Sequence, residues 1–205
     1  MKTKKILIIL TLFLGGFSVN SQTSAEFEPS IMYVNARAGL RVRSEPNINS
    51  MILGTFQYGR IVIAIERSYN SATINGISNY WYRLWYWTGR ENKIGWIFGG
   101  YLSEELPEDI PVVIGIWDDI NNPRQYYRYN IDNNYSEGYK GTGIGMFGTW
   151  QLNGNVIQLH FNRAMGDIEL DEYTNLRIID RNNIEISYEN EIRRLRRNRS
   201  GEGWY

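Results

Sequence analysis

The chain has 205 residues, with 22 Lys and Arg, 22 Asp and Glu, one His and no Cys. Its even charge argues against a protein held on nucleic acid by overall charge, which requires a strongly basic domain. The lack of cysteine excludes disulfides, thiolate metal sites and cysteine nucleophiles, and the single His160 excludes multi-histidine zinc sites. A hydrophobic content of 42% is enough for a packed core. The composition disfavours most classes of enzyme, and we expect no metal and no cofactor.

The first 21 residues have the pattern of a cleaved signal peptide. Three lysines lie within the first five residues, and an uncharged, mostly apolar stretch follows from residue 6 to residue 19. That stretch is shorter than the roughly 20 residues of a membrane-spanning helix. Val19-Asn20-Ser21 then offers permissive residues for cleavage. We therefore expect a secreted or periplasmic mature chain without an integral membrane span, with an uncleaved membrane anchor as the alternative.

The rest of the chain predicts an all-β protein. No window between residues 30 and 190 has sustained helical periodicity, whereas short segments alternate between apolar and polar residues. Turn dipeptides such as Asn75-Gly76, Asn133-Asn134 and Asn153-Gly154 separate these segments. Many short strands at this spacing are typical of β-sandwiches and β-barrels.

One acidic and proline-containing segment divides the mature chain. The segment from Ser103 to Pro111 holds four acidic residues and two prolines, and proline cannot donate to a β-sheet ladder. We predict a first module over residues 30–105, a linker over 106–111 and a second module over 112–200. Both lengths suit small β-barrels.

The first module resembles the bacterial SH3-like domain over residues 32–103. The motifs that carry the resemblance are, in order, Leu40-x-Val42-Arg43-Ser44-x-Pro46, Gly54-Thr55, Trp81-Tyr82-x-Leu84, Gly95-Trp96-Ile97 and Tyr101-Leu102. The chain departs from the family pattern in a long loop, predicted over Glu66–Asn79, and in an extended aromatic strand that follows it. The resemblance implies a module that binds cell-wall glycan, peptide or an envelope protein.

The aromatic strand supplies the candidate ligand-binding residues. Alternate residues of a strand face opposite sides, so an inward Leu84 leaves four residues facing outward, namely Trp81, Arg83, Trp85 and Trp87. Exposed indoles are frequent in recognition surfaces, and an arginine can hold a carboxylate through two hydrogen bonds. The alternative is that the second module or the predicted loop covers these indoles.

The second module resembles the small lipocalin-like β-barrels of bacterial envelope proteins over residues 114–196. Two Gly-x-Trp motifs, Gly115–Trp117 and Gly148–Trp150, precede a final arginine-bearing strand. Because a small closed barrel is filled by its own side chains, we predict that Trp117 and Trp150 occupy its interior. The alternative is a bound hydrophobic ligand.

Other polar residues receive simpler interpretations. His160 is predicted to face solvent, since Leu159 and Phe161 would face the core. Several acidic residues are predicted to be solvated, and five glycines are predicted to form a flexible hairpin arm. The acidic residues are Asp118, Asp119, Asp167, Glu169, Asp171 and Glu172, and the glycines are Gly138, Gly141, Gly143, Gly145 and Gly148. A contact surface for an anionic polymer or lipid is a further candidate, with a solvated strand edge as its alternative; its residues are Arg193, Arg194, Arg196 and Arg197.

Together these features favour a non-catalytic, exported binding or scaffold protein of the bacterial cell envelope. In this hypothesis the first module contacts peptidoglycan or a protein partner. Two alternatives remain at this stage: a carrier of a small apolar ligand in the second barrel, and a targeting subunit of a cell-wall enzyme.

Overall fold

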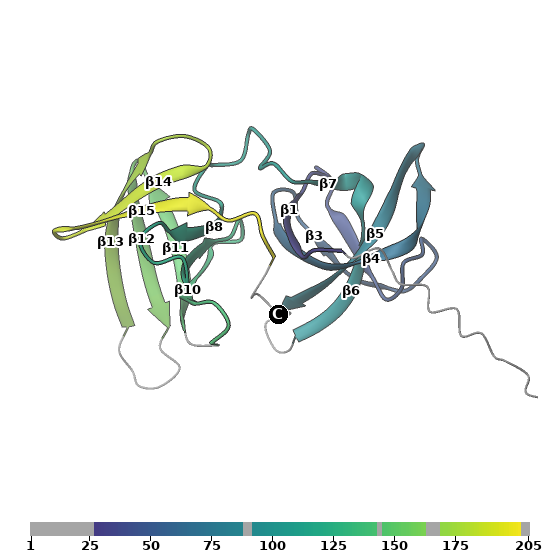
Figure 1. The fold of residues 1–205 in the computed structure, drawn as a ribbon, viewed down its shortest axis with the longest axis horizontal. Coiled ribbons are helices and arrows are strands. Elements are labelled where there is room, and N and C mark those ends of the chain that lie inside the picture. The colour runs from purple at the N-terminus through teal and green to yellow at the C-terminus, as the bar shows by residue number, and fades with distance from the viewer. Residues whose placement is uncertain (1–26, 88–91, 143–144, 163–168, 202–205) are drawn as a thin grey trace, which may run out of the picture.

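The computed structural model describes residues 27–87, 92–142, 145–162 and 169–201. These residues form two antiparallel β-structures side by side, a curled sheet and a closed barrel (Figure 1). Apart from one turn of 3-10 helix, η1 (Gly99–Tyr101), the regular elements of the described residues are strands. The all-β prediction is therefore confirmed. The predicted signal peptide lies outside the described residues.

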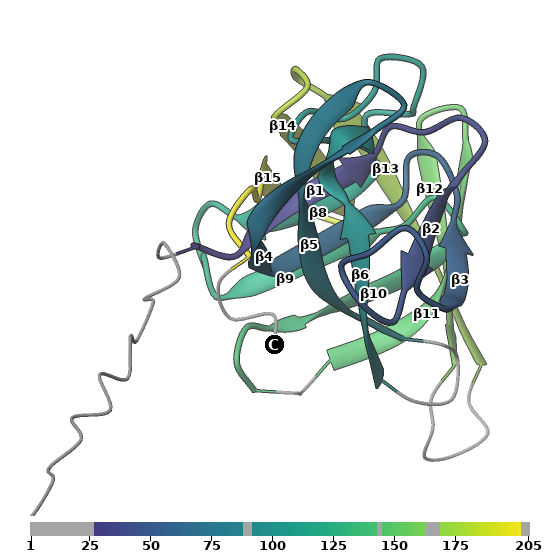
Figure 2. The same cartoon turned by 90° about the vertical axis from the view of Figure 1, so that its right-hand side faces the viewer.

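Sheet A contains seven strands in the order β3-β2-β6-β5-β4-β1-β7 and curls around a small interior (Figure 2). Its core consists of apolar residues such as Val34, Val42, Leu84 and Ile97. The strands are β1 (Ser30–Val34), β2 (Leu40–Arg43), β3 (Ile52–Phe56), β4 (Ile61–Ile74), β5 (Ile77–Trp87), β6 (Asn92–Phe98) and β7 (Leu102–Ser103).

The predicted loop over Glu66–Asn79 is wrong, because most of that segment is a β-hairpin. β4 pairs with β5 up to the pair Ile74–Ile77, and only Asn75 and Gly76 form the turn. Both turn residues have positive φ, 51° and 79°, as a type I′ turn requires. The sequence carried the Asn-Gly signal for this turn, but two irregularities in the register interrupt the alternation before it.

Eight strands form a closed barrel in which nearly every strand pairs with its neighbours along the chain. The strands are β8 (Gly115–Asp119), β9 (Gln125–Tyr129), β10 (Asn134–Tyr139), β11 (Gly145–Asn153), β12 (Val156–Asn162), β13 (Glu169–Ile178), β14 (Asn183–Tyr188) and β15 (Glu191–Arg197). The pairing of β15 with β8 closes the barrel. The glycine-rich arm predicted to be flexible is part of the barrel wall, since Gly138 pairs with Gly145 and Tyr135 with Gly148.

The two tryptophans of the Gly-x-Trp motifs occupy the barrel core, as predicted. Trp117 is fully buried and Trp150 is nearly so. Each indole N–H donates to a backbone carbonyl, Trp117 to Val113 at 2.8 Å and Trp150 to Asn130 at 2.9 Å. These hydrogen bonds satisfy the only polar atom of each indole, so both rings are buried without an unpaired donor.

Strand β1 belongs to both cores. Met32 and Val34 pack in the core of sheet A, whereas Ile31 and Tyr33 pack in the cluster that also contains the barrel core. Successive strand side chains point to opposite faces, so a single strand contributes to both structures. The sequence shows this only as an unbroken apolar stretch, which is typical of a strand buried on both faces.

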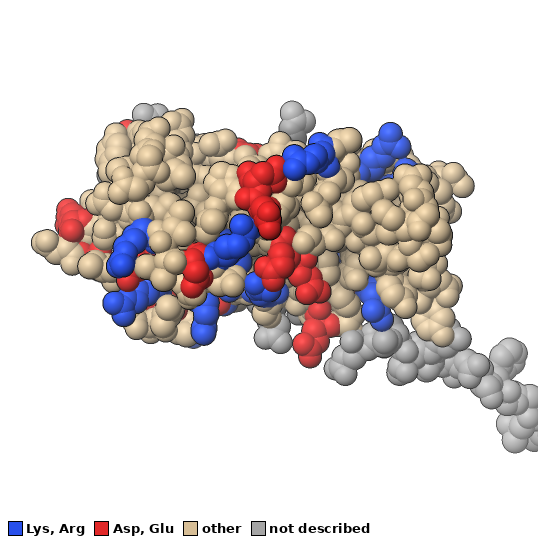
Figure 3. Space-filling model, turned by 90° about the horizontal axis from the view of Figure 1, so that it is seen from above, with Lys and Arg blue, Asp and Glu red and all other residues tan. Residues whose placement is uncertain are grey.

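The predicted linker packs between the two structures. Leu106 and Ile110 are buried in the barrel cluster, and Asp109 accepts a hydrogen bond from Tyr58 at 2.5 Å and pairs with Arg37 at 2.9 Å. Figure 3 shows acidic and basic side chains side by side along this junction. The linker therefore fixes sheet A and the barrel to each other.

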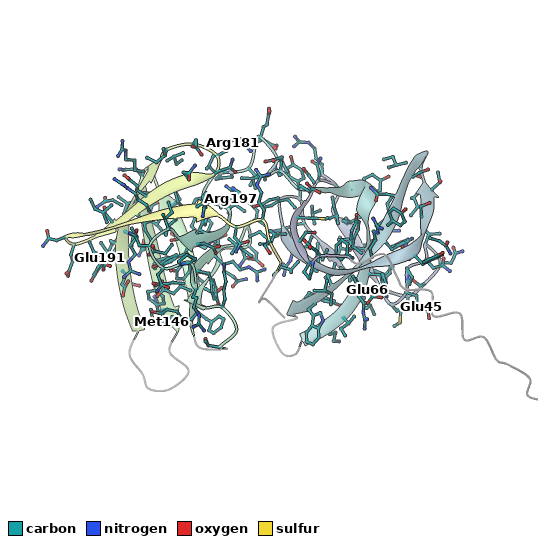
Figure 4. The ribbon with its side chains drawn as sticks, viewed as in Figure 1. Glu45, Glu66, Met146, Arg181, Glu191 and Arg197 are labelled. Carbon is teal, nitrogen blue, oxygen red and sulfur yellow. The ribbon has the colours of Figure 1, made fainter. Side chains whose placement is uncertain are left out.

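Arg197 is the principal polar contact at the junction (Figure 4). It is buried, and its guanidinium stacks over Trp117 at 4.3 Å from the ring centre. It donates to the Tyr33 hydroxyl at 2.8 Å and to the backbone carbonyls of Ile114, Val112 and Arg181 at 2.7, 2.6 and 2.8 Å. A Cβ at position 115 would lie 2.3 Å from this guanidinium, which explains the glycine of the Gly-x-Trp motif.

The chain segment after β15 continues across the junction to β1. The Ile31 amide donates to the Arg199 carbonyl at 3.1 Å, and the Gly201 amide donates to the Pro29 carbonyl at 2.8 Å. Arg199 also pairs with Glu105. Residues near the two ends of the described chain therefore hold sheet A against the barrel.

We expect Arg197→Lys to lower the free energy of unfolding by about 2–4 kcal/mol, because lysine cannot satisfy four spatially separated acceptors, two of them buried and two part-buried. Arg196→Lys is the matched control, since Arg196 is the exposed neighbour in the same strand. Urea unfolding of both variants measures the difference. Equal stability of the two variants would show that the buried hydrogen bonds of Arg197 contribute little.

Candidate functional site

The four residues predicted to form a ligand-binding row have different environments. Trp81 is buried at 3% exposure, whereas Trp85 is exposed at 47%. Arg83 is half-buried, and the side chain of Trp87 lies outside the described residues. The prediction of a continuous exposed row is therefore wrong at Trp81.

Trp81 is buried because the outer face of the sheet has its own aromatic cluster. Trp81 lies directly opposite Phe98 in the β5–β6 register, with 5.6 Å between ring centres, and Phe98 contacts Tyr101 of η1 at 5.9 Å. The alternation of the strand correctly separates Trp81 from Leu84. It does not reveal that η1 brings the ring of Tyr101 against Phe98.

The exposed part of the same face forms an apolar patch centred on Trp85 and Ile94. These two residues are opposite each other on β5 and β6, with exposures of 47% and 41%. The next pair is Arg83 with the half-buried Trp96, and Trp96 in turn lies opposite Arg43. We call Arg83, Trp85, Ile94 and Trp96 the outer patch. Directly opposed side chains share one face of a sheet, so the outer patch is a continuous surface.

Sequence reasoning missed two exposed apolar residues beside this surface, at the start of β3. Ile52 is 49% exposed and pairs with Arg43, the residue that lies opposite Trp96. Met51, immediately before it, is 66% exposed. Exposed apolar residues in neighbouring strands are typical of interaction sites. The apolar dipeptide Met51-Ile52 was a signal in the sequence. The side of the sheet to which Ile52 points, however, depends on the bulge at Val42 and Arg43.

Arg83 has a carboxylate partner within the chain. Its Nη1 lies 2.7 Å from Glu66 Oε2, and both side chains are partly exposed. A partly exposed ion pair contributes little to stability. A carboxylate from a ligand would therefore compete with Glu66 for this guanidinium.

The four C-terminal arginines do not form one surface. Arg194 and Arg196 are exposed, whereas Arg197 is buried and Arg193 contacts the Tyr127 hydroxyl and Glu191. Arg194 pairs with Glu185 at 3.1 Å. Alternation along β15 directs neighbouring arginines to opposite sides, so the predicted anionic contact surface is wrong for Arg193 and Arg197.

The remaining polar candidates have structural partners. His160 is partly exposed between buried Leu159 and Phe161, as predicted, and lies 2.8 Å from Asp171. Asp119 is not solvated but buried, where it accepts hydrogen bonds from the Asn121 and Asn122 amides. Asp118 pairs with Lys140 at 2.7 Å. Asp167, Gly143 and the side chain of Glu169 lie outside the described residues. Among the described residues, no cluster of three or more His, Asp or Glu is suited to a metal ion.

A concave site, which the sequence did not reveal, lies in the closed barrel. It is a cavity of about 250 Å³ lined by residues from β9 to β15. Its polar lining comes mainly from four tyrosines and three glutamates, namely Tyr127, Tyr129, Tyr135, Tyr188, Glu137, Glu172 and Glu191, together with Arg193 and Thr174. Alternation would have placed these residues inside the barrel, but their convergence depends on the stagger of its strands.

Burial controls the ionisation of the groups in this cavity. Burial raises the pKa of Tyr127 to about 12, although its hydrogen bond from Arg193 opposes the increase. Burial also raises the pKa of Glu137, and the hydrogen bond from Tyr135 at 2.6 Å only partly offsets that effect. The Tyr129 hydroxyl is fully buried and has no hydrogen-bond partner among the described residues. The cavity therefore holds polar groups whose interactions are incomplete.

Comparison with known proteins concerns the first of the two structures. Residues 38–103, about a third of the chain, match the family model of the bacterial SH3 domain. This match covers most of sheet A and supports the SH3-like resemblance. A search of curated proteins and a search of solved structures each gave no match. In the described residues, no helix is long and apolar enough to cross a membrane.

The match over residues 38–103 suggests a cell-wall or protein binding module. Bacterial SH3 domains generally bind cell-wall or protein partners, and they are typical of extracellular and cell-envelope proteins. The outer patch lies within the matched residues.

We expect Glu137→Gln to raise the melting temperature at pH 7, because burial disfavours the charged carboxylate in the folded state. When the pKa of a carboxyl group is higher in the folded state than in the unfolded state, the folded protein becomes less stable as the pH rises through that range. The benefit of the variant should therefore shrink as the pH falls towards 4.5, the ordinary value for this group. Thermal melts between pH 4 and pH 8 test this sign, and a benefit that increases at low pH would contradict it.

Proposed function

We propose that this chain is an exported, non-catalytic binding or scaffold protein of the bacterial cell envelope, in which the outer patch contacts peptidoglycan or a protein partner. The observation that carries the proposal is the exposed pair of Trp85 and Ile94 within the region that matches the bacterial SH3 domain. A flat indole beside an aliphatic side chain suits the apolar face of a sugar ring or a peptide side chain.

The polar neighbours of Trp85 support a ligand that carries carboxylates. Arg83 can present a planar pair of donors to such a group, and its present partner Glu66 is itself partly exposed. The buried Arg43 donates to the Ser50 carbonyl at 2.7 Å and so supports the strand beside Trp96. The outer patch thus combines an apolar centre with one guanidinium, that of Arg83, which can exchange Glu66 for a carboxylate of the ligand.

Retention on purified peptidoglycan tests the outer patch. We expect Trp85→Ala to weaken retention about tenfold or more, because truncating a central aromatic contact commonly has an effect of this size. Phe147→Ala is the matched control, since Phe147 is a 61% exposed aromatic residue of the closed barrel. Unchanged retention of the Trp85 variant, or an equal loss in the control, would exclude the outer patch as the peptidoglycan site.

Removing the internal competitor should strengthen binding to an acidic ligand. We expect Glu66→Gln to increase affinity for a carboxylate-bearing cell-wall fragment by about two- to fivefold, because a partly exposed ion pair is weak and its loss frees Arg83. Glu45→Gln removes the same charge from another exposed position of the first module. Titration calorimetry separates the two variants, and equal gains would indicate an effect of net charge rather than of Arg83.

A further inference from the structure

The cavity of the closed barrel carries an inference that is independent of the outer patch. Its lining comes from seven of the eight barrel strands and includes no residue of sheet A. A volume of about 250 Å³ is near the lower limit for small-molecule pockets, roughly 300 Å³. It therefore suits a ligand with only a few non-hydrogen atoms.

The charges of the cavity are not balanced within the described residues. Arg193 is the one basic residue of the described lining, and it is already paired with Glu191 at 3.0 Å and bonded to the Tyr127 hydroxyl. Glu137 receives a hydrogen bond from Tyr135, and neither Glu137 nor Glu172 has a basic partner within ion-pair distance among the described residues. Two carboxylates thus face the same cavity, where burial and then Glu172 raise the pKa of Glu137, and the more distant Arg193, already paired with Glu191, only partly offsets the shared negative charge.

An unused hydroxyl provides a second and separate observation. Tyr129 lines the cavity with 0% exposure, and no partner lies within normal hydrogen-bond distance of its hydroxyl among the described residues, although the nearby Tyr135 hydroxyl lowers its pKa against the larger effect of burial. A buried hydroxyl without a partner is unfavourable by about 1–3 kcal/mol. A ligand that donates a hydrogen bond to the Tyr129 oxygen would reduce that penalty by satisfying its acceptor.

These features exclude several ligand classes. An apolar ligand would cover the two carboxylates and the Tyr129 hydroxyl without compensating them. An anion would be repelled by the same carboxylates. A metal ion does not fit, because the described residues contain no suitable cluster of ligating side chains.

We propose that the barrel cavity binds a small organic ammonium ion. Glu137 and Glu172 supply the counter-charge, and Tyr129 accepts a hydrogen bond from the ligand. Arg193 remains paired with Glu191, and its own positive charge disfavours a ligand with a high positive charge. The second barrel is then a receptor for a cation, in contrast to the apolar carrier considered from sequence alone.

Titration calorimetry with the purified protein tests the ligand class. The probes are 1,4-diaminobutane and tetramethylammonium, with 1,4-butanediol as a neutral control of similar size. We expect at least one of the two cations to bind at least about tenfold more tightly than the diol, because only a cation compensates the carboxylates. Equal affinities for the diol and both cations, or no measurable binding of either cation up to 10 mM, would overturn the proposal.

Two variants locate the site. Glu172→Gln should weaken binding of the tighter cation about tenfold, whereas Asp171→Asn should not, because Asp171 is the adjacent residue on the outer face of β13 and pairs with His160. Tyr129→Phe should weaken the primary amine by severalfold but tetramethylammonium much less, since the latter has no N–H to donate. An unchanged affinity in Glu172→Gln would overturn the assignment. The outcome is separate from the peptidoglycan experiment, which uses residues of sheet A.

Discussion

Burial of strand β1 on both faces is the constraint on which the arrangement of this protein depends. Met32 and Val34 complete one core, while Ile31 and Tyr33 extend the other. Neither face of β1 can be exposed without leaving large apolar side chains in water. Such exposure is unfavourable by a free energy of roughly 25 cal/mol for each Å² of apolar surface. Sheet A and the barrel consequently share strand β1 as part of both cores, whereas domains joined only by a flexible linker have separate cores.

The same junction fixes the orientation of the two candidate sites. Arg197 and the packed residues Leu106 and Ile110 join one side of the barrel to sheet A, and Figure 4 shows Glu191, which lines the barrel cavity, on the side away from the sheet. The outer patch belongs to β5 and β6, which do not contribute to that cavity. The two candidate sites are therefore separate surfaces that have no residue in common.

The sequence predicted the features that depend on local alternation and on turn chemistry. The all-β class and the Asn75-Gly76 turn followed from these rules, and the burial of Trp117 and Trp150 followed from the expectation that a small closed barrel is filled by its own side chains. Features that depend on contacts between distant segments did not follow. Trp81 is covered because Phe98 lies opposite it, and the cavity arises from the stagger of seven strands. Alternation gives the side to which a residue points, but it does not say what lies on that side.

The order of strands in the barrel has a consequence for how the chain reaches its final form. Seven of the eight strand pairings join sequence neighbours, whereas the pairing of β15 with β8 joins segments some 80 residues apart. Closing so large a loop is entropically unfavourable, and pairings between distant segments are intrinsically slow to form. That same pairing places Arg197 opposite Trp117. The contact between the Arg197 guanidinium and the Trp117 ring would therefore form only when β15 pairs with β8. A barrel without this final step is an open ribbon of hairpins with two unpaired edges, a species prone to self-association.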